Sequence, residues 1–311
     1  MFSLQRFSLD EIPEKLPNLP GVYAFCQRDS LEHCLYIGKS IHLKERIMSH
    51  VYSKEPREKR IIQSTRSILV MPTVGEFSAL MYESNWVKRY APLYNKKLRR
   101  SKSLFTIEFK AEKASGYWQA QVKAMNDITM CFNNHHFGLF LRRDAAISYL
   151  RSLVKDHRIC GKRLGLEKTL KACFQFQIKR CAGACVGKQS AQEYNQELSA
   201  LLSSQQLSPW PFDGPIALIE ASYVLGYQAK HIIDNWSYKG FYLSAINHPN
   251  TNSLKTISGD SDSLLFNRDD YHIIKKRIQL ALKYSDANST NSHKSTLVLE
   301  RISRNTCSHD N

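Results

Sequence analysis

A chain of 311 residues is too long for one ordinary hydrophobic core and long enough for two or three modest ones. Its 42% hydrophobic, 23% charged and 11% aromatic residues are typical of a folded protein and exclude a disordered or fibrous one. The 44 Lys and Arg residues against 28 Asp and Glu residues leave a formal charge of +16, which attracts polyanions. Nucleic acid is therefore the first candidate partner, and a merely solubilising, membrane-surface or ribosome-bound role of the charge is the alternative.

The sequence predicts a cytoplasmic protein with no membrane partner. No stretch approaches the roughly 18 to 20 apolar residues that a membrane span needs, and the amino terminus has no hydrophobic signal core. Cysteines stay reduced in the cytoplasm, so a group of them suggests a metal site rather than disulfides. Of the eight cysteines, four lie between residues 160 and 185.

The first hundred residues carry alternating strand and helix patterns. Strands are expected where short aromatic or apolar runs are bounded by turn residues, and helices where apolar residues repeat at helical spacing. In chain order these patterns predict a strand over 20–27, its hairpin partner over 34–38, a helix over 41–52 capped by Ser40, a strand over 68–74 and a helix over 76–90 that Pro92 ends.

The rest of the chain continues with mixed elements. After a very basic stretch over 96–102, the patterns predict a strand over 137–141, a helix over 143–155, a cysteine-rich segment and a polar helix over 189–206. The run Leu207-Ser208-Pro209-Trp210-Pro211 predicts a boundary before a last, smaller unit that starts near Gly214. The fold class expected from this order is α+β.

Two tripeptides mark a candidate site in the first hairpin. Gly21-Val22-Tyr23 and Tyr36-Ile37-Gly38 are separated by 12 residues, which would place the two tyrosines on neighbouring antiparallel strands with hydroxyls near one site. Lys39 follows immediately. The plainer interpretation is that both tyrosines are ordinary strand aromatics.

Three charged or titratable residues follow on the two helices. Arg46 and His50 are four residues apart and share a helical face. Glu83 falls at the edge of an apolar stripe, where a carboxylate needs a partner or a metal. The plainer alternative is a solvated face for Arg46 and His50, and a pairing of Glu83 with Lys39 or Lys88.

Taken together, these residues resemble the GIY-YIG nuclease family. GVY, YIGKS, Arg46, His50, Glu83 within ALMYESNWVKRY and Asn95 within PLYNKK follow the order and spacing of that domain. The resemblance implies a small domain with a three-stranded antiparallel sheet and flanking helices, and a metal-dependent DNA endonuclease. His50 departs from the pattern of the family member UvrC, where this position is usually tyrosine.

The resemblance also implies roles for the polar residues. Glu83 would hold a single Mg²⁺ or Mn²⁺ ion, which keeps several waters and takes further ligands from the substrate phosphate. Arg46 would stabilise the transition-state phosphate, and His50 would orient or protonate an oxygen. Either tyrosine would activate the water, helped by the charge of Lys39. The expected catalytic residues are Tyr23, Tyr36, Lys39, Arg46, His50, Glu83 and Asn95.

A basic flank surrounds these residues. Many Lys and Arg residues but only five acidic ones lie between Tyr36 and Lys102. Contacts of such residues with phosphates give affinity without base preference, and a set of solvated charges is the alternative. The residues expected to bind DNA are Lys39, Lys96, Lys97, Arg99 and Arg100.

Cys160, Cys173, Cys181 and Cys185 form the second candidate site. Their gaps of 12, 7 and 3 residues match neither the common zinc nor the usual ferredoxin spacing, so four unconnected buried thiols are an open alternative. The segment from Cys173 to Cys185 resembles a UvrC segment that ends in Cys-Leu-x-Tyr-Gln-Ile-x-Arg-Cys-x-x-x-Cys. That resemblance implies a [4Fe-4S] cluster, with zinc as the second choice.

The layout resembles the first half of UvrC and, over nearly the whole length, its stand-alone Cho homologues. It implies one 3′-side incision near a bulky lesion in damaged double-stranded DNA, with UvrB as partner and UvrA as its loader. The alternatives are a catalytically silent iron-sulfur DNA-binding adapter and a general or restriction-type GIY-YIG nuclease. The expected parts are a nuclease domain over 1–100, a UvrC-like α+β connecting region over 101–158, a cysteine-rich region over 159–206, a small α+β C-terminal domain over 207–284 and a flexible tail over 285–311.

Overall fold

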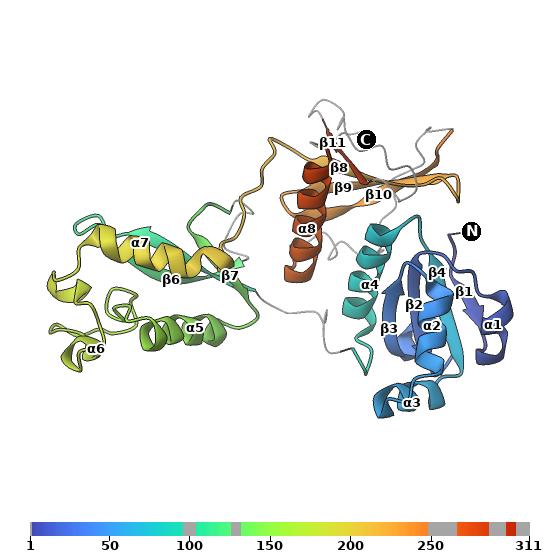
Figure 1. Cartoon of the computed structure of the whole chain (residues 1–311), viewed down its shortest axis with the longest axis horizontal. Helices are drawn as coiled ribbons and strands as arrows, with labels where there is room; N and C mark the ends of the chain where they lie inside the picture. Colours follow the sequence, from blue (N-terminus) through green and yellow to red (C-terminus); the bar gives the residue numbers. More distant parts are fainter. Residues whose placement is uncertain (1, 96–103, 126–131, 248–265, 286–296, 303–311) are drawn as a thin grey trace, which may run out of the picture. The chain divides into compact units, whose positions relative to one another are not determined.

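The computed structural model describes residues 2–95, 104–125, 132–247, 266–285 and 297–302. The chain divides into two compact units, shown in Figure 1. The first unit joins residues 1–100 with 212–311, and the second consists of residues 101–211. In sequence, the second unit is thus an insertion into the first. Both units combine helices with antiparallel sheets, which confirms the α+β class.

The first sheet has the order β1-β4-β2-β3, all antiparallel. Its strands are β1 (Gln5–Phe7), β2 (Gly21–Cys26), β3 (Cys34–Ser40) and β4 (Ser67–Pro72). The sheet has one strand more than the three expected, because β1 pairs with β4. Three residues are too few to show the two-residue alternation by which a strand is recognised in sequence.

Helices cover both faces of this sheet, which explains why all six residues of β2 are buried. Phe25 and Val70 pack with Leu43 of α2 (Leu43–Val51) and Ile61 of α3 (Pro56–Gln63). On the other face, Val22, Ala24 and Ile37 pack with Trp86 and Val87 of α4 (Glu76–Tyr90). A strand with two covered faces reads as a continuous apolar run in sequence.

The helix ends agree with the sequence for α4 and differ for α2. Helix α4 spans the 76–90 expected, and Ala91 ends it in the left-handed conformation at a φ of 44°. Helix α2 starts at Leu43 with His42 as N-cap, so Ser40 is not the cap. Instead, the Ser40 hydroxyl accepts a hydrogen bond from the His42 main-chain N–H at 3.0 Å, within the turn before the helix.

The C-terminal domain, residues 212–302, completes the first unit. Its antiparallel sheet has the order β10-β9-β8-β11. Its elements are β8 (Ile216–Ser222), β9 (Tyr227–Asp234), β10 (Ser237–Ala245), α8 (Arg268–Ser285) and β11 (Leu297–Arg301). Figure 1 shows α4 between β3 and α8, with which it is in contact.

Strand β11 lies in the segment expected to be a flexible tail. Residues 297–301 instead pair with β8, from Leu297 opposite Glu220 to Arg301 opposite Ile216. The expectation of flexibility does not hold for these residues, because the apolar run Leu297-Val298-Leu299 supplies an edge strand that pairs with β8. Residues 286–296 and 303–311 of the expected tail lie outside the described residues.

The second unit is built on a three-stranded antiparallel sheet of order β6-β5-β7. Its elements are β5 (Phe105–Ala111), β6 (Trp118–Ala124), β7 (His136–Phe140), α5 (Arg143–Asp156), α6 (Phe174–Gln177) and α7 (Ala191–Leu202). The core of the unit joins Phe109 and Phe137 of the sheet with Leu150 of α5, Tyr194 of α7 and Cys160. Among the described residues of the chain, no helix is long and apolar enough to cross a membrane.

Candidate active site

Close approaches explain the two glycines of the strand motifs. A Cβ atom on Gly38 would lie 2.5 Å from the hydroxyl oxygen of Tyr23. A Cβ atom on Gly21 would lie 2.5 Å from the main-chain oxygen of Met71 and 2.6 Å from the side chain of Leu43. Glycine therefore lets β3 lie directly beneath the Tyr23 ring, and lets α2 and β4 close on β2.

The two tyrosines lie side by side but differ in exposure. Tyr23 is opposite Gly38 in the strand pair, Tyr36 is opposite Phe25, and the two tyrosine ring centroids are 6.3 Å apart. Tyr23 is 0% exposed, whereas Tyr36 is half-buried. Burial raises the pKa of both hydroxyls, that of Tyr23 the more strongly. Of the two, Tyr36 is therefore the tyrosine that reaches solvent.

His50 connects Tyr23 to helix α3. Its Nε2 atom lies 2.7 Å from the Tyr23 hydroxyl oxygen, and its Nδ1 atom lies 2.5 Å from a carboxylate oxygen of Glu58. Burial lowers the pKa of His50, although Glu58 acts in the opposite direction. A neutral imidazole can donate from Nδ1 to Glu58 and accept at Nε2 from Tyr23. His50 is buried, so the solvated face considered from sequence is wrong for this residue.

Arg46 lies exposed on α2, one turn before His50. Its guanidinium interacts with the hydroxyls of Tyr23 and Tyr36, and its charge lowers the pKa of both against the larger effect of burial. A guanidinium has five N–H donors, so N–H groups that do not face the tyrosines can bind phosphate oxygens.

Glu83 lies on α4, and burial raises the pKa of its carboxyl group to about 7. Lys39 pairs with Glu76 at 2.6 Å, and Lys88 pairs with Asp270 at 2.8 Å. Among the described residues, neither lysine forms an ion pair with Glu83, contrary to the plainer alternative. A divalent cation favours the ionised form of a carboxylate beside it. A half-buried carboxylate of this kind fits the expected Mg²⁺ or Mn²⁺ ligand.

Asn95 binds the main chain of the second motif. Its side-chain oxygen accepts from the Ile37 N–H at 2.9 Å, and its side-chain nitrogen donates to the Ile37 oxygen at 2.8 Å. Both bonds hold β3 at the residue next to Tyr36. This geometry favours a positioning role over contact with the reacting phosphate.

Of the five residues expected to bind DNA, the structure describes Lys39, which pairs with Glu76. Lys96, Lys97, Arg99 and Arg100 lie outside the described residues. Near the site, the Arg57 guanidinium lies 5.6 Å from the Tyr36 ring centroid and donates to the main-chain oxygen of Tyr94 at 2.6 Å. Lys59 and Arg60 are exposed on the same helix, α3. A basic surface therefore adjoins Tyr36 in the described part of the chain.

Two carboxylates of this site escaped the sequence analysis: Glu58, the partner of His50, and Glu76, the partner of Lys39. The scarcity of acidic residues in this segment could have pointed to both carboxylates. The basic segment between Tyr36 and Lys102 has only five acidic residues, and three of them are Glu58, Glu76 and Glu83. An isolated carboxylate in such a segment is a candidate for a specific partner.

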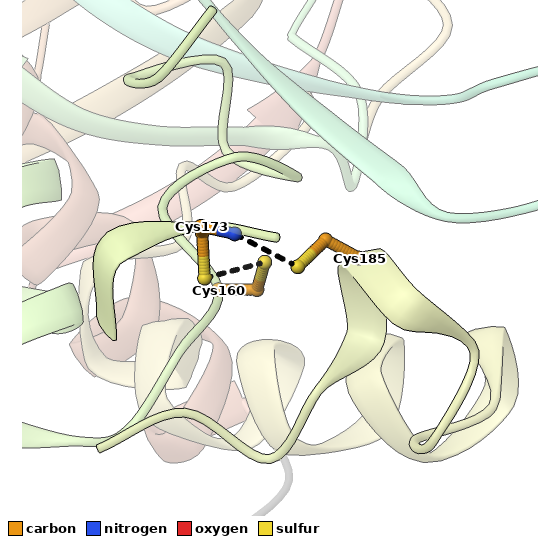
Figure 2. Close-up of side chains that lie close together, drawn as sticks. All are labelled: Cys160, Cys173 and Cys185. Atoms are coloured by element: carbon orange, nitrogen blue, oxygen red, sulfur yellow. Dashed lines mark hydrogen bonds between the residues drawn. The ribbon is translucent and has the colours of Figure 1, made fainter. Parts of the chain in front are cut away.

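The cysteine cluster lies in the second unit. The Sγ atoms of Cys160, Cys173 and Cys185, drawn in Figure 2, all lie within 4.8 Å of one another. The Sγ atoms of Cys160 and Cys173 are 3.8 Å apart, and the Cys173 N–H donates to the Cys185 sulfur at 3.4 Å. Cys181 stands outside this triplet, yet its charge acts on the pKa of Cys160 and Cys173. Thiol donors gathered in this way fit a metal site, and the alternative of unconnected thiols is wrong for the triplet.

Comparisons with known proteins match one family model in each of the two units. A family model described as a UvrC-like GIY-YIG domain matches residues 19–96, and one described as the UvrC/Cho excinuclease middle domain matches residues 106–204. Excinuclease cho of Salmonella typhimurium is 36% identical over 240 residues, which cover 74% of this chain and 78% of that protein. Excinuclease cho of Escherichia coli strain K12 is 34% identical over 265 residues, which cover 84% of this chain and 83% of that protein.

Two more distant similarities concern UvrC itself. UvrABC system protein C of Psychrobacter arcticus is 31% identical over 195 residues, which cover 61% of this chain and 31% of that protein. The solved magnesium-bound GIY-YIG N-terminal endonuclease domain of UvrC from Thermotoga maritima is 29% identical and corresponds to 28% of this chain and 92% of that chain. The TM-score of the latter is 0.26.

Proposed function

Because the chain belongs to the UvrC/Cho excinuclease family, we propose that it makes a single incision on the 3′ side of a bulky lesion, in damaged double-stranded DNA that UvrA has loaded with UvrB. Membership of the family makes it a GIY-YIG endonuclease of nucleotide excision repair. A cytoplasmic location, where bacterial DNA lies, belongs to the same proposal.

The observation that carries the proposal is the convergence of Tyr36, Arg46 and Glu83 in the first unit. Helix α4, which carries Glu83, packs against β3, which carries Tyr36, and the Arg46 guanidinium of α2 interacts with the Tyr36 hydroxyl. They offer a hydroxyl, a guanidinium and a carboxylate, the groups that phosphodiester hydrolysis with one metal ion needs. The described part of the chain contains one such site, which suits one incision per binding event.

Tyr36 is the better candidate for the general base. A general base must come within hydrogen-bond reach of the attacking water. Tyr36 has solvent access, whereas Tyr23 is fully buried and its hydroxyl is already bonded to His50. Tyr36 can therefore take a proton from water that approaches from solvent, while the positive charges of Arg46 and Arg57 favour its ionised form.

The buried Tyr23–His50–Glu58 chain has a positioning role in this scheme. The Arg46 guanidinium interacts with the Tyr23 hydroxyl, and a neutral His50 can accept the Tyr23 proton at Nε2 and donate its Nδ1 proton to Glu58. Each group then has one defined direction of donation. Such a chain holds the Arg46 guanidinium ready for the phosphate oxygens at which negative charge develops.

Glu83 is the proposed ligand of the metal. When bound, Mg²⁺ or Mn²⁺ supplies polarisation of the scissile phosphate and offsets charge on the leaving oxygen. The chain's contribution is to hold one carboxylate on a rigid helix in a half-buried place.

Cys160, Cys173, Cys181 and Cys185 are the proposed ligands of a [4Fe-4S] cluster, with zinc as the second choice. The proximity of the Sγ atoms and the all-thiol donor set support either group. Anaerobically purified protein should be brown and contain about four iron atoms per chain, as the proposed cluster requires. Stoichiometric zinc without iron would contradict the cluster and support the second choice.

The test of the nuclease is nicking of an end-labelled duplex with one bulky adduct, in Mg²⁺, with and without UvrA and UvrB. Wild-type protein should nick only with both, and Glu83→Gln should lower the rate by a factor on the order of 10³, as loss of a metal ligand removes transition-state stabilisation worth several kcal/mol. The matched control is Glu32→Gln, the same chemical change at an exposed position. Binding without cleavage by the wild type would favour the silent adapter.

A further inference from the structure

A carboxylate from the C-terminal domain caps the helix that carries Glu83. Glu220, on β8, accepts hydrogen bonds from the main-chain N–H groups of Phe77 and Ser78 at 2.7 and 3.0 Å. It also accepts from the Ser78 hydroxyl at 2.7 Å. These donors belong to the first turn of α4, where the helix leaves N–H groups without partners inside the helix.

Helix α4 has no cap of its own. Its N-cap residue is Gly75, which offers no side chain. A Cβ atom at Gly75 would lie 2.4 Å from a carboxylate oxygen of Glu220. Glycine at this position thus admits a cap from Glu220, which lies 142 positions after Ser78 in sequence. A carboxylate at a helix N-terminus also meets the positive end of the helix dipole.

Glu220 is itself buried, at 3% exposure, and it is well compensated. The nearest oxygen of its carboxylate is 3.7 Å from Nε2 of His231, whose Nδ1 lies 2.8 Å from the Tyr238 hydroxyl. Burial acts to raise the pKa of Glu220, but His231 and Ser78 hold it below its ordinary value. A buried carboxylate costs several kcal/mol unless it is paired and hydrogen-bonded, so this cap is a specific contact.

Two more contacts join the C-terminal domain to α4. Asp270 of α8 accepts from the Ser84 hydroxyl at 2.6 Å and from the Lys88 ammonium at 2.8 Å. Ser84 is the neighbour of Glu83 in sequence, and it is fully buried. The helix is therefore held from the same domain on both sides of the metal ligand.

The third contact reaches the lysine of the second motif. Arg277 of α8 donates to one carboxylate oxygen of Glu76 at 2.5 Å, and Lys39 donates to the other at 2.6 Å. Glu76 is the first residue of α4. The C-terminal domain thus fixes the helix start and, through Glu76, the direction of the Lys39 side chain.

We propose that the C-terminal domain is a structural part of the catalytic centre, in which Glu220 is the positioning residue that sets α4, and with it Glu83, against Tyr36 and Arg46. This inference rests on the proposed nuclease function. It assigns a role to residues 212–302, which lie outside both segments matched by family models.

The test compares full-length Glu220→Gln with wild type. An amide has one acceptor oxygen, and its NH₂ group would face main-chain donors, so the cap is lost. The main-chain amides of α4 should exchange hydrogen faster. The affinity for Mn²⁺ without DNA should fall by about tenfold, and Glu83→Gln measures the Mn²⁺ binding that does not involve Glu83. Nicking should fall by a factor on the order of 10², the expected effect of a small misplacement. The control is Glu300→Gln, the same change at an exposed position on β11 of the same sheet.

A rescue separates positioning from general stability. Glu220→Ala removes all three atoms that a Cβ at Gly75 would meet, and Gly75→Asp then supplies a local N-cap carboxylate. The Gly75→Asp/Glu220→Ala double variant should recover the α4 protection and the Mn²⁺ affinity that Glu220→Ala alone loses. Gly75→Asp alone should not reach wild-type values, because the Glu220 side chain still occupies the space beside residue 75. If Glu220→Gln does not fold, Ser78→Ala, which removes one of the three bonds, should shift both readouts in the same direction by less.

Unchanged α4 exchange and unchanged Mn²⁺ affinity in a folded Glu220→Gln, or in Ser78→Ala, would overturn the inference. Both readouts are taken without DNA or activity. A wild-type protein that binds Mn²⁺ through Glu83 but nicks no DNA would instead contradict the proposed function and leave the Glu220 measurements valid.

Discussion

Tyr23 and Tyr36 share one side of the first hairpin, but only one of the two hydroxyls has access to solvent. Tyr36→Phe should therefore lower the nicking rate by about 10²- to 10⁴-fold, the usual contribution of a general base. Tyr23→Phe should cost less in rate, since it removes a bond to His50 rather than the base. Single-turnover rates of the two variants check this order, and a larger loss for Tyr23→Phe would reverse the assignment.

The pH dependence follows from the raised pKa of Tyr36, of which burial is the main cause. At neutral pH the hydroxyl is then mostly protonated, and the fraction of base grows with pH. The single-turnover rate should rise by about tenfold per pH unit between roughly pH 7 and 9. A rate that is flat over this range in wild-type protein would exclude ionised Tyr36 as the base.

His50 makes the folding stability depend on pH, and this stability falls on the acidic side of neutrality. Burial lowers its pKa in the folded state, so the unfolded chain binds a proton more readily. The stabilising contribution is complete above the ordinary histidine value of about 6.5 and is lost as the pH falls from there through the folded value. Denaturant unfolding of wild type and His50→Gln between those limits should show the smaller pH slope for the variant. Equal slopes would mean that His50 is protonated in the fold.

At the scale of elements, the first hairpin depends on glycine where β3 passes beneath Tyr23. Gly38→Ala would place a Cβ 2.5 Å from the Tyr23 oxygen, so the ring or the strand must move. Overpacking of this kind costs typically 1 to 3 kcal/mol, and nicking should fall as well because Tyr36 lies two residues away. Urea unfolding together with nicking rates measures both effects. A variant with wild-type stability would show that the approach is easily relaxed.

The cysteine segment should depend on its metal. Cys160 and Cys173 lie in the core of the second unit, and burial raises the pKa of both thiols, whereas a bound metal favours thiolates. Removal of the metal by a chelator should therefore lower the thermal midpoint of the protein by several degrees, as loss of about 1 to 2 kcal/mol would. Cys185→Ser should lower metal content and reproduce the shift. No change in midpoint on full metal loss would make the cluster dispensable for folding.

Local periodicity predicted some elements well and others not at all. The bounds of α4 followed from its helical period between Gly75 and Pro92, and the β2–β3 hairpin from its turn residues. β1 and β11 were missed because each is short and is stabilised by pairing with a strand distant in sequence. The cap of α4 was missed for the same reason, since nothing near Gly75 in sequence points to Glu220.

At the scale of the whole molecule, the site residues divide in the same way. Tyr23, Tyr36, Arg46 and Glu83 were predicted as site residues because the resemblance to a known family fixed their order and spacing. Glu58, Glu76 and Glu220 bind partners on other elements, and the local sequence around each residue does not indicate these partners. The insertion of residues 101–211 into the first unit was likewise hidden, because the sequence lists domains in linear order.

The net charge of +16 makes DNA affinity a property of the whole molecule. Phosphate contacts release counterions, so the affinity for undamaged duplex should fall steeply with salt, with little dependence on base sequence. A double-logarithmic plot of affinity against salt measures the number of contacts. Arg60→Gln, at an exposed position on α3, should reduce the slope by about 1 if this residue binds a phosphate, and leave it unchanged if it does not.

The position of the nick tests the proposed repair function most directly. A duplex with one bulky adduct, labelled in turn at each end of each strand, is incubated with the protein, Mg²⁺, UvrA and UvrB. One nick in the damaged strand, on the 3′ side of the adduct, absent without UvrB and absent in Glu83→Gln, is the predicted result. A nick that ignores the adduct, falls on its 5′ side or persists in Glu83→Gln would contradict the proposed function.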